Sequence, residues 1–305
     1  MGSVWSADIP LDEAAARQLI AAQFPALAGH ELRPLGVGWD NTAYLVGAAT
    51  VFRFPRRQSA AKLLDREARI LPLLAPHLPV PIPAPTFVGT PTPAFPYPFV
   101  GYPFLRGALA SDLAVSDLDD ARTALAAPLG AFLRTLHGIP IDADTRTWAP
   151  GDEIARNDLA GRAPGLNVRL RGNAAALDGA DVARLVALVG RLATTPARAA
   201  PPCWVHGDLY PRHLLLDEAQ RFVGVIDWGD VHLGDPALDL SLAWTFLPVA
   251  AHPAFRAGYG PIDAATWDRA RFRAIHYGAI LAEYGRAEGI APLLDLAIAT
   301  LRRFL

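Results

Sequence analysis

Proline distribution places the strongest constraint on how this chain folds. Residues 79–98 contain eight prolines in twenty positions. Because proline lacks a backbone N–H and has a fixed φ, this stretch forms neither one long helix nor a central strand. We interpret it as a stiff, extended path with short strands. It separates two parts of the chain that have different hydrophobic patterns.

The part before the prolines shows helical and strand-like segments. The hydrophobic spacing predicts two helices, over 12–24 and 60–74. Asp12 is the expected N-cap of the first, and Pro72 predicts a kink or an early stop in the second. Strands are expected over 42–46 and 50–54, joined across 47–49, and the extended path leads into 99–105. Phe52 and Phe54 then share one face of their strand, since side chains alternate along it.

The part after Gly107 is mostly helical in pattern. Helices are expected over 119–136, 181–192, 236–247 and 266–288. Residues 142–173 are expected to be irregular, and the short apolar runs 214–216 and 222–226 predict a small hairpin. Strands early and helices late predict an α+β fold. Its β-rich N-terminal lobe would span 1–105, with a connector at about 99–106, and its helical C-terminal lobe would span 106–305.

Composition narrows the class of protein. The 305 residues are 52% hydrophobic and 19% charged, which is typical of a globular protein. The net charge is −2 and no basic block occurs, so a nucleic acid is not an expected partner. Cys203 is the only cysteine, which excludes an intrachain disulfide and favours a reducing compartment. We see no secretory signal or membrane-spanning run, so we expect a cytoplasmic protein without a membrane partner.

Two carboxylates lie in segments suited to phosphate chemistry. Asp208 follows His206 and Gly207 in a turn, and Asp227 follows the apolar run 222–226. Phosphoryl transfer needs a carboxylate that orients the acceptor hydroxyl, ligands for Mg²⁺, and cations or N–H groups for the phosphates. If a short hairpin pairs the two aspartates, they would face one cleft.

These segments resemble the aminoglycoside phosphotransferase family, which shares the two-lobed protein-kinase-like fold. His206-Gly-Asp208 is similar to the family's catalytic-loop triplet, and the resemblance implies that Asp208 is the catalytic base. Ile226-Asp227-Trp-Gly is similar to its metal-binding segment, which implies that Asp227 is an Mg²⁺ ligand. Asp235-Pro-Ala-Leu-Asp239-Leu resembles the following motif, in which Asp239 would support the catalytic loop.

The resemblance extends through the N-terminal part, in the expected order from about residue 35 to 245. Residues 35–44 are similar to the loop that covers the nucleotide. Arg53 stands where many relatives have lysine, and Glu67 stands at the position of its partner on a helix. Residues 99–106 would be the hinge that binds the base. The resemblance thus assigns nucleotide binding to Gly36, Gly38, Asn41, Arg53, Glu67, Tyr102, Phe104 and Leu105.

His213 departs from the common pattern. Kinases usually place an asparagine for a second metal contact there, and Mg²⁺ prefers oxygen ligands. The macrolide phosphotransferase branch of the family is similar at this position, so His213 stays a predicted metal ligand. A ligating histidine must be neutral, and activity would then fall as the pH drops through roughly 6.5.

The resemblance implies an ATP- or GTP-dependent O-phosphotransferase with Mg²⁺, acting on a small polyhydroxyl acceptor such as an aminoglycoside or macrolide antibiotic. A kinase of a sugar or amino alcohol is an alternative, and so is a non-catalytic nucleotide-binding protein. An aminoglycoside predicts an acidic pocket, for which Asp230, Asp235 and Glu283 are candidates. A macrolide predicts an apolar pocket, which Trp228 could line. A protein kinase is disfavoured, since no long activation segment fits between Asp227 and Asp235.

Overall fold

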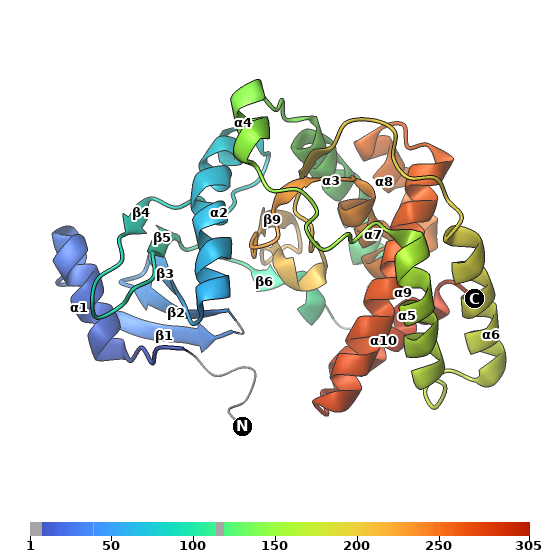
Figure 1. The fold of residues 1–305 in the computed structure, drawn as a ribbon, viewed down its shortest axis with the longest axis horizontal. Coiled ribbons are helices and arrows are strands. Elements are labelled where there is room, and N and C mark those ends of the chain that lie inside the picture. Colours follow the sequence, from blue (N-terminus) through green and yellow to red (C-terminus); the bar gives the residue numbers. More distant parts are fainter. Residues whose placement is uncertain (1–7, 39, 114–118) are drawn as a thin grey trace. The chain divides into compact units, whose positions relative to one another are not determined.

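The computed structural model describes residues 8–38, 40–113 and 119–305. Two compact units divide the chain. The first comprises the chain up to Gly107 together with Gly224–Val231, and the second comprises Ala108–Val223 and His232–Leu305. Sheet dominates the first unit and helices the second (Figure 1). The predicted α+β class with a β-rich and a helical lobe is therefore confirmed.

An antiparallel five-stranded sheet forms the first unit, in the order β1-β2-β3-β5-β4. Its strands are β1 Leu32–Val37, β2 Asn41–Val46, β3 Thr50–Pro55, β4 Phe87–Gly89 and β5 Phe99–Pro103. The predicted strands β2 and β3 pair with each other as a hairpin, from Asn41 opposite Pro55 to Val46 opposite Thr50. The proline-rich segment contributes only the short strand β4, as its composition predicts.

Two α-helices belong to this unit, α1 Glu13–Gln23 and α2 Gln58–Leu74. Asp12 caps α1 as predicted, because its Oδ1 accepts a hydrogen bond from the Ala15 N–H at 2.8 Å. Of the two alternatives expected at Pro72, the early stop is wrong, because α2 continues to the predicted end at Leu74, while a kink stays a prediction. Proline removes a single helical hydrogen bond near the end of α2, while the buried Leu71 and Leu74 side chains still hold that turn against the core.

Aromatic rings fill the core of the first unit. Phe52 and Phe54 of β3 are 0% and 1% exposed, which confirms that they share the buried face. The Phe54 ring stacks on Phe99 of β5 with centroids 4.7 Å apart, and Phe95 meets Phe54 edge to face at 5.7 Å. Because β3 carries this core on one face, its alternate residue Arg53 points to the other face.

Helices make up most of the second unit: α3 Asp119–Gly138, α4 Ala143–Trp148, α5 Leu159–Gly172, α6 Gly179–Leu192, α7 Ala237–Phe246, α8 His252–Tyr259, α9 Ala264–Ala287 and α10 Ala291–Arg302. The expectation that 142–173 is irregular is wrong, since it contains α4 and α5. Asp142 and Asp158 cap these two helices. Pro164 and the mixed polarity of α5 hide its helical period.

Short strands and 3₁₀ turns complete the fold. The strands are β6 Ala108–Leu109, β7 Cys203–Val205, β8 Leu214–Leu216, β9 Phe222–Val225 and β10 His232–Gly234. They form one pair, β10-β7, and one three-stranded sheet, β6-β8-β9, which contains the predicted hairpin. The 3₁₀ turns are Pro25–Leu27, Ala75–His77, Ala110–Asp112, Pro211–His213 and Val249–Ala251.

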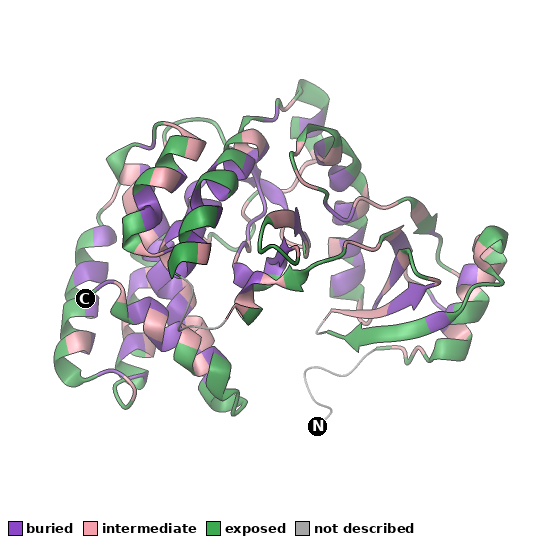
Figure 2. Ribbon diagram, turned by 180° about the vertical axis from the view of Figure 1, so that it is seen from behind, coloured by how far each residue is buried: buried purple, intermediate pink, exposed green. Residues whose placement is uncertain are grey.

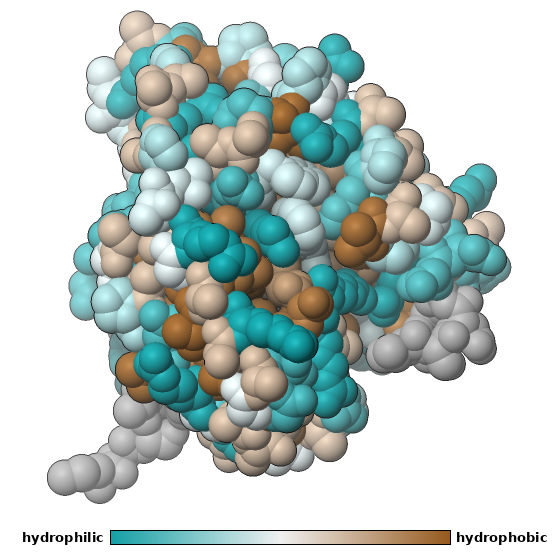
Figure 3. Space-filling view, turned by 90° about the vertical axis from the view of Figure 1, so that its right-hand side faces the viewer, coloured by the Kyte–Doolittle hydropathy of each residue, from teal (hydrophilic) through white to brown (hydrophobic). Residues whose placement is uncertain are grey.

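The core of the second unit lies around α7 and α9. Nearly every residue of α7 is buried, and α9 packs against α5, α6, α7 and α10. Figure 2 shows buried residues concentrated where the helices of this unit pack together. On the face seen in Figure 3, hydrophilic side chains are intermingled with small groups of apolar ones. In the described ranges, every helix is too short or too polar to cross a membrane.

Candidate active site

Arg53 forms the centre of a charged cluster in the first unit. Its Nη1 donates to Glu67 Oε2 of α2 at 2.8 Å, and its Nη2 lies 3.8 Å from Asp227 Oδ1. The Tyr102 hydroxyl of β5 lies within interaction range of the guanidinium. Four segments that are distant in the sequence thus bring two carboxylates and a phenol to one cation.

Burial controls the charges of this cluster. Desolvation raises the pKa of Glu67 to about 7, and Arg53 opposes that rise. Burial acts to lower the pKa of Arg53, but Glu67, Tyr102 and Asp227 outweigh it, so the net shift is upward. Burial also raises the pKa of Tyr102 to about 12. Arg53 therefore stays a permanent cation, as a group that binds phosphate oxygens must be.

Asp227 lies in an unusual backbone conformation. Its φ is +63°, in the left-handed region that only aspartate, asparagine and glycine enter readily. The neighbouring Trp228 is fully buried, and its Nε1–H donates to the Val225 carbonyl at 3.1 Å. Trp228 thus belongs to the core and anchors the segment, while the Asp227 side chain is 53% exposed. Strained positions of this kind often mark functional residues.

The predicted nucleotide-covering loop connects β1 and β2. The pairing of these strands shifts between Pro34 and Gly36, and the Gly38 N–H donates to the Asn41 carbonyl at 2.9 Å. Arg56 Nη1 donates to the Gly38 carbonyl at 2.8 Å. The Oδ1 of Asn41 is buried and has no hydrogen-bond partner among the residues that the structure describes. Trp39, also in the predicted loop, lies outside the described residues.

The predicted hinge is the end of β5 and the residues after it. Tyr102 faces Arg53, so this side chain supports the charged cluster. The Phe104 N–H donates to the Ala49 carbonyl at 2.7 Å, so Phe104 would meet a base through its carbonyl or its ring. Leu105 follows it with intermediate burial. Base binding by these residues stays a prediction.

A buried carboxylate holds the catalytic-loop segment of the second unit. Asp239 of α7 accepts hydrogen bonds from the N–H groups of His206 at 2.7 Å and Gly207 at 2.9 Å. Gly207 has a φ of +84°, a backbone conformation that a side chain would strain, so this turn favours glycine. His206 is fully buried, and its Nδ1 accepts from the Asp208 N–H at 3.3 Å.

Two further residues support Asp239, and sequence reasoning missed both. The Nε2 of His137 lies 3.2 Å from Asp239 Oδ2, and its Nδ1 lies 3.0 Å from the Tyr259 hydroxyl. Burial acts to raise the pKa of Asp239, but its contacts with His137, His206 and Gly207 outweigh that effect and lower it. Nothing in the sequence near His137 or Tyr259 indicates this contact, because the three residues are far apart along the chain.

His213 is tied to the same loop. Its Nδ1 lies 2.9 Å from the Asp208 carbonyl, which can only accept, so Nδ1 carries a proton, and in the neutral ring Nε2 then holds the lone pair. A ligating histidine usually has this arrangement. No group of three histidine, cysteine or acidic side chains suited to a metal occurs in the described part of the chain. The Asp227 carboxylate suits Mg²⁺, whereas an imidazole suits it less well.

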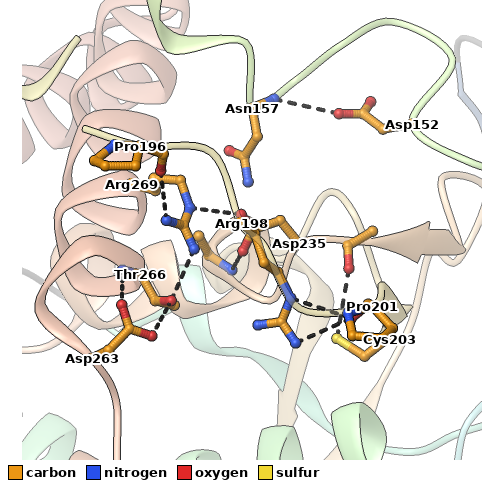
Figure 4. A network of polar contacts seen from close by, with 12 residues as sticks. Asp152, Asn157, Pro196, Arg198, Pro201, Cys203, Asp235, Asp263, Thr266 and Arg269 are labelled. Atoms are coloured by element: carbon orange, nitrogen blue, oxygen red, sulfur yellow. Dashed lines mark hydrogen bonds and ion pairs between the residues drawn. The ribbon is translucent and has the colours of Figure 1, made fainter. Parts of the chain in front are cut away.

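Arginines form ion pairs with two of the acidic side chains that were candidates for binding a cationic acceptor. Asp235 Oδ2 accepts from the buried Arg269 at 2.7 Å, and Arg269 also donates to the Pro196 carbonyl and to Thr266 (Figure 4). Glu283 pairs with Arg169 at 2.9 Å. Asp230 lies in the first unit. Asp208 itself has a cation beside it, since Arg273 Nη2 is 4.0 Å from its Oδ1.

A sheet-rich unit with an Arg–Glu pair and a helical unit with an aspartate-supported His-Gly-Asp turn define the class of small-molecule kinases with a protein-kinase-like fold. The chain belongs to the phosphotransferase enzyme family, which it matches over residues 31–274.

Comparisons with individual proteins support this family. The chain is similar to aminoglycoside 2'-phosphotransferase-IIIa in its GDP complex, with 25% identity, coverage of 96% of this chain and 98% of that one, and a TM-score of 0.73. A macrolide 2'-phosphotransferase, MphH from Brachybacterium faecium, shares the fold at 24% identity, coverage of 96% and 98%, and a TM-score of 0.62. A stretch of 41 residues is 44% identical to the uncharacterized Bacillus subtilis protein YcbJ and covers 13% of each chain.

Proposed function

We propose that this protein transfers the γ-phosphoryl group of ATP or GTP to a hydroxyl of a small polyhydroxyl molecule. The observation that carries the proposal is the cluster of Arg53, Glu67 and Asp227, in which one cation holds a carboxylate at 2.8 Å and faces another at 3.8 Å. A cation beside an exposed carboxylate suits a triphosphate with a bound divalent metal ion. The complexes of the relative with GDP support a nucleotide donor.

Each residue of the cluster has a proposed role. Arg53 binds phosphate oxygens through its planar fork, and Glu67 keeps that fork in place. Asp227, with His213, would hold Mg²⁺, which would neutralise phosphate charge when bound. Gly36, Gly38 and Asn41 would cover the phosphates, and Tyr102, Phe104 and Leu105 would adjoin the base. The cytoplasm, which supplies nucleoside triphosphates, is the proposed compartment.

Asp208 is the proposed catalytic base. Its carboxylate would orient the acceptor hydroxyl and take its proton late in the transfer. Asp239 keeps the loop in shape by accepting from the His206 and Gly207 N–H groups. Little other chemistry is required, since alignment and charge neutralisation supply most of the rate enhancement in phosphoryl transfer.

The proposed acceptor is an antibiotic of the aminoglycoside or macrolide type, which the names of the similar structures support. A sugar or amino alcohol is the alternative acceptor. Because Asp235 and Glu283 already pair with arginines, a macrolide suits the second unit better than an aminoglycoside with several ammonium groups.

The test uses ATP and GTP with Mg²⁺, a panel of antibiotics and sugars, and the mass of each product. We expect one acceptor to gain a phosphoryl group, and slow triphosphate hydrolysis without acceptor. Asp208→Asn should lower transfer at least about 100-fold, since a general base typically contributes 10²–10⁴-fold. Tight nucleotide binding with neither transfer nor hydrolysis in the wild type would instead identify a non-catalytic nucleotide-binding protein.

A further inference from the structure

Arg273 is an unusual cation in the middle of α9. It is 9% exposed, its Nη2 lies 4.0 Å from Asp208 Oδ1, and its guanidinium lies over the Tyr277 ring, 5.7 Å from the centroid. The contact with Asp208 is too long for a hydrogen bond. Within the described ranges, no protein group accepts a hydrogen bond from this guanidinium. Buried charged donors are normally satisfied, so the fork is suited to a bound ligand.

Further positive charge lies near Arg273. Arg162 donates to the main-chain carbonyls of Ala155 and Ile154, which leave its charge uncompensated. Burial, and after it Arg273, Arg162 and Arg169, lowers the pKa of His276 to about 3, so this histidine is neutral. Its Nδ1 is buried and lacks a hydrogen-bond partner in the part of the chain that the structure describes.

The acidic groups of this region are already compensated. Asp152 pairs with Arg156 at 3.3 Å, and Glu283 pairs with Arg169 at 2.9 Å. An acceptor with several ammonium groups loses water on binding and needs carboxylates in return. Around Asp208 such an acceptor would meet Arg273 instead, with Arg162 adding positive charge near that arginine. A carboxylate or carbonyl group of the acceptor could instead accept hydrogen bonds from the Arg273 guanidinium.

We propose that Arg273 binds the acceptor and selects one that presents a carboxylate or carbonyl oxygen, not an ammonium group, beside its reacting hydroxyl, which favours the sugar alternative over an antibiotic that carries amino groups there. The inference rests on the proposed role of Asp208 as the base. A hydroxyl in hydrogen-bond reach of Asp208 has its neighbouring substituents near a guanidinium that is 4.0 Å from that carboxylate. The arginine fork then binds a carboxylate through two parallel hydrogen bonds, and a carbonyl through one.

The test measures binding of four sugars with one ring and different substituents: glucuronate, glucuronamide, glucose and glucosamine. Titration calorimetry or ligand-observed NMR without nucleotide gives each affinity. We expect glucuronate to bind about tenfold more tightly than glucose, and glucosamine to bind most weakly. Arg273→Gln should abolish the preference for glucuronate, and Arg273→Lys should retain part of it, since lysine keeps the charge without the fork.

Arg286→Gln is the matched control, because Arg286 also lies on α9 and its side chain donates hydrogen bonds to Gly172 and Asn173. This variant should leave the order of the four sugar affinities unchanged. A strong preference for glucuronate over glucuronamide identifies a carboxylate acceptor, and equal affinities identify a carbonyl acceptor. Three results would overturn the inference. They are tightest binding of glucosamine, no binding of glucuronate or glucuronamide by the wild type, and a preference for glucuronate that survives Arg273→Gln. Triphosphate hydrolysis and its loss in Asp208→Asn test the proposed function independently.

Discussion

Single residues in this protein gain their properties from neighbours that are remote in the sequence. Arg53 shows this, because it stands where relatives often carry lysine. Its two terminal nitrogens reach different partners, Glu67 at 2.8 Å and Asp227 at 3.8 Å. A lysine ammonium is a single point of charge and does not span two partners in this way. The arginine is therefore compatible with phosphate binding, and its partners explain its retained charge.

His276 leads to a prediction about stability and pH. Its pKa is about 3 in the folded protein and about 6.5 in a solvated chain. Between pH 3 and 6.5 the unfolded state binds a proton at His276 that the folded state does not bind. The contribution of neutral His276 to the free energy of unfolding is therefore fully present above pH 6.5 and is lost as the pH falls toward 3. The loss is at most about 1.4 kcal/mol per pH unit.

Urea unfolding at pH 7, 6, 5 and 4 checks this prediction by comparing the wild type with His276→Gln. The free energy of unfolding should fall more steeply with acid in the wild type. Parallel pH profiles for the two proteins would show that His276 titrates normally in the fold.

At the scale of elements, close helix packing builds the support of the catalytic loop. The helices α3 and α8 approach at two glycines: a Cβ on Gly130 would lie 2.2 Å from the Phe255 carbonyl oxygen, and one on Gly258 would lie 2.3 Å from the Ala127 carbonyl oxygen. His137 lies on α3 and Tyr259 on α8, and the two meet at 3.0 Å. The absence of two side chains thus permits the contact that supports Asp239.

We expect Gly130→Ala to force α8 away from α3, because the new methyl group would overlap main-chain atoms of Phe255 and Tyr259. The free energy of unfolding should fall by about 1–3 kcal/mol, as for other overpacked cores. Gly138→Ala is the matched control on the same helix, since its Cβ would meet nothing within 4 Å. Chemical denaturation measures both. Equal stability of the two variants would contradict the packing argument.

At the scale of the whole molecule, the candidate groups are divided between two compact units. Arg53, Glu67 and Asp227 belong to the first, because Gly224–Val231 joins that unit although it lies between α6 and α7 of the helical unit in sequence. Asp208 and Arg273 belong to the second. Nucleotide binding and phosphoryl transfer should therefore be separable by mutation.

Thermal unfolding with and without Mg²⁺ and a triphosphate measures this separation. A ligand at 100 times its dissociation constant stabilises the native state by about 2.7 kcal/mol, which raises the melting temperature. We expect Asp227→Asn to lose most of the Mg²⁺-dependent increase and Asp208→Asn to keep it while losing transfer. If both variants lost the Mg²⁺-dependent rise in melting temperature to the same extent, separate roles for Asp227 and Asp208 would be contradicted.

The sequence by itself determined the local features. Asp12 caps its helix, the hairpin of β2 and β3 and the buried pair Phe52 and Phe54 follow from residue pattern, and the motifs indicated the family. These features depend on neighbours within a few residues, so propensity and periodicity report them. Helix α5 was missed because its internal proline and mixed polarity hide the period that marks a helix.

The tertiary structure alone decided which distant groups meet. His137 contacts Asp239 across 102 positions and Tyr259 across 122, and Arg273 reaches Asp208 from another segment of the chain. Such contacts depend on how packed helices bring their faces together, and no local pattern encodes them. The charge environment of Asp208, and with it the expected class of acceptor, therefore follows from the fold and not from the order of the residues.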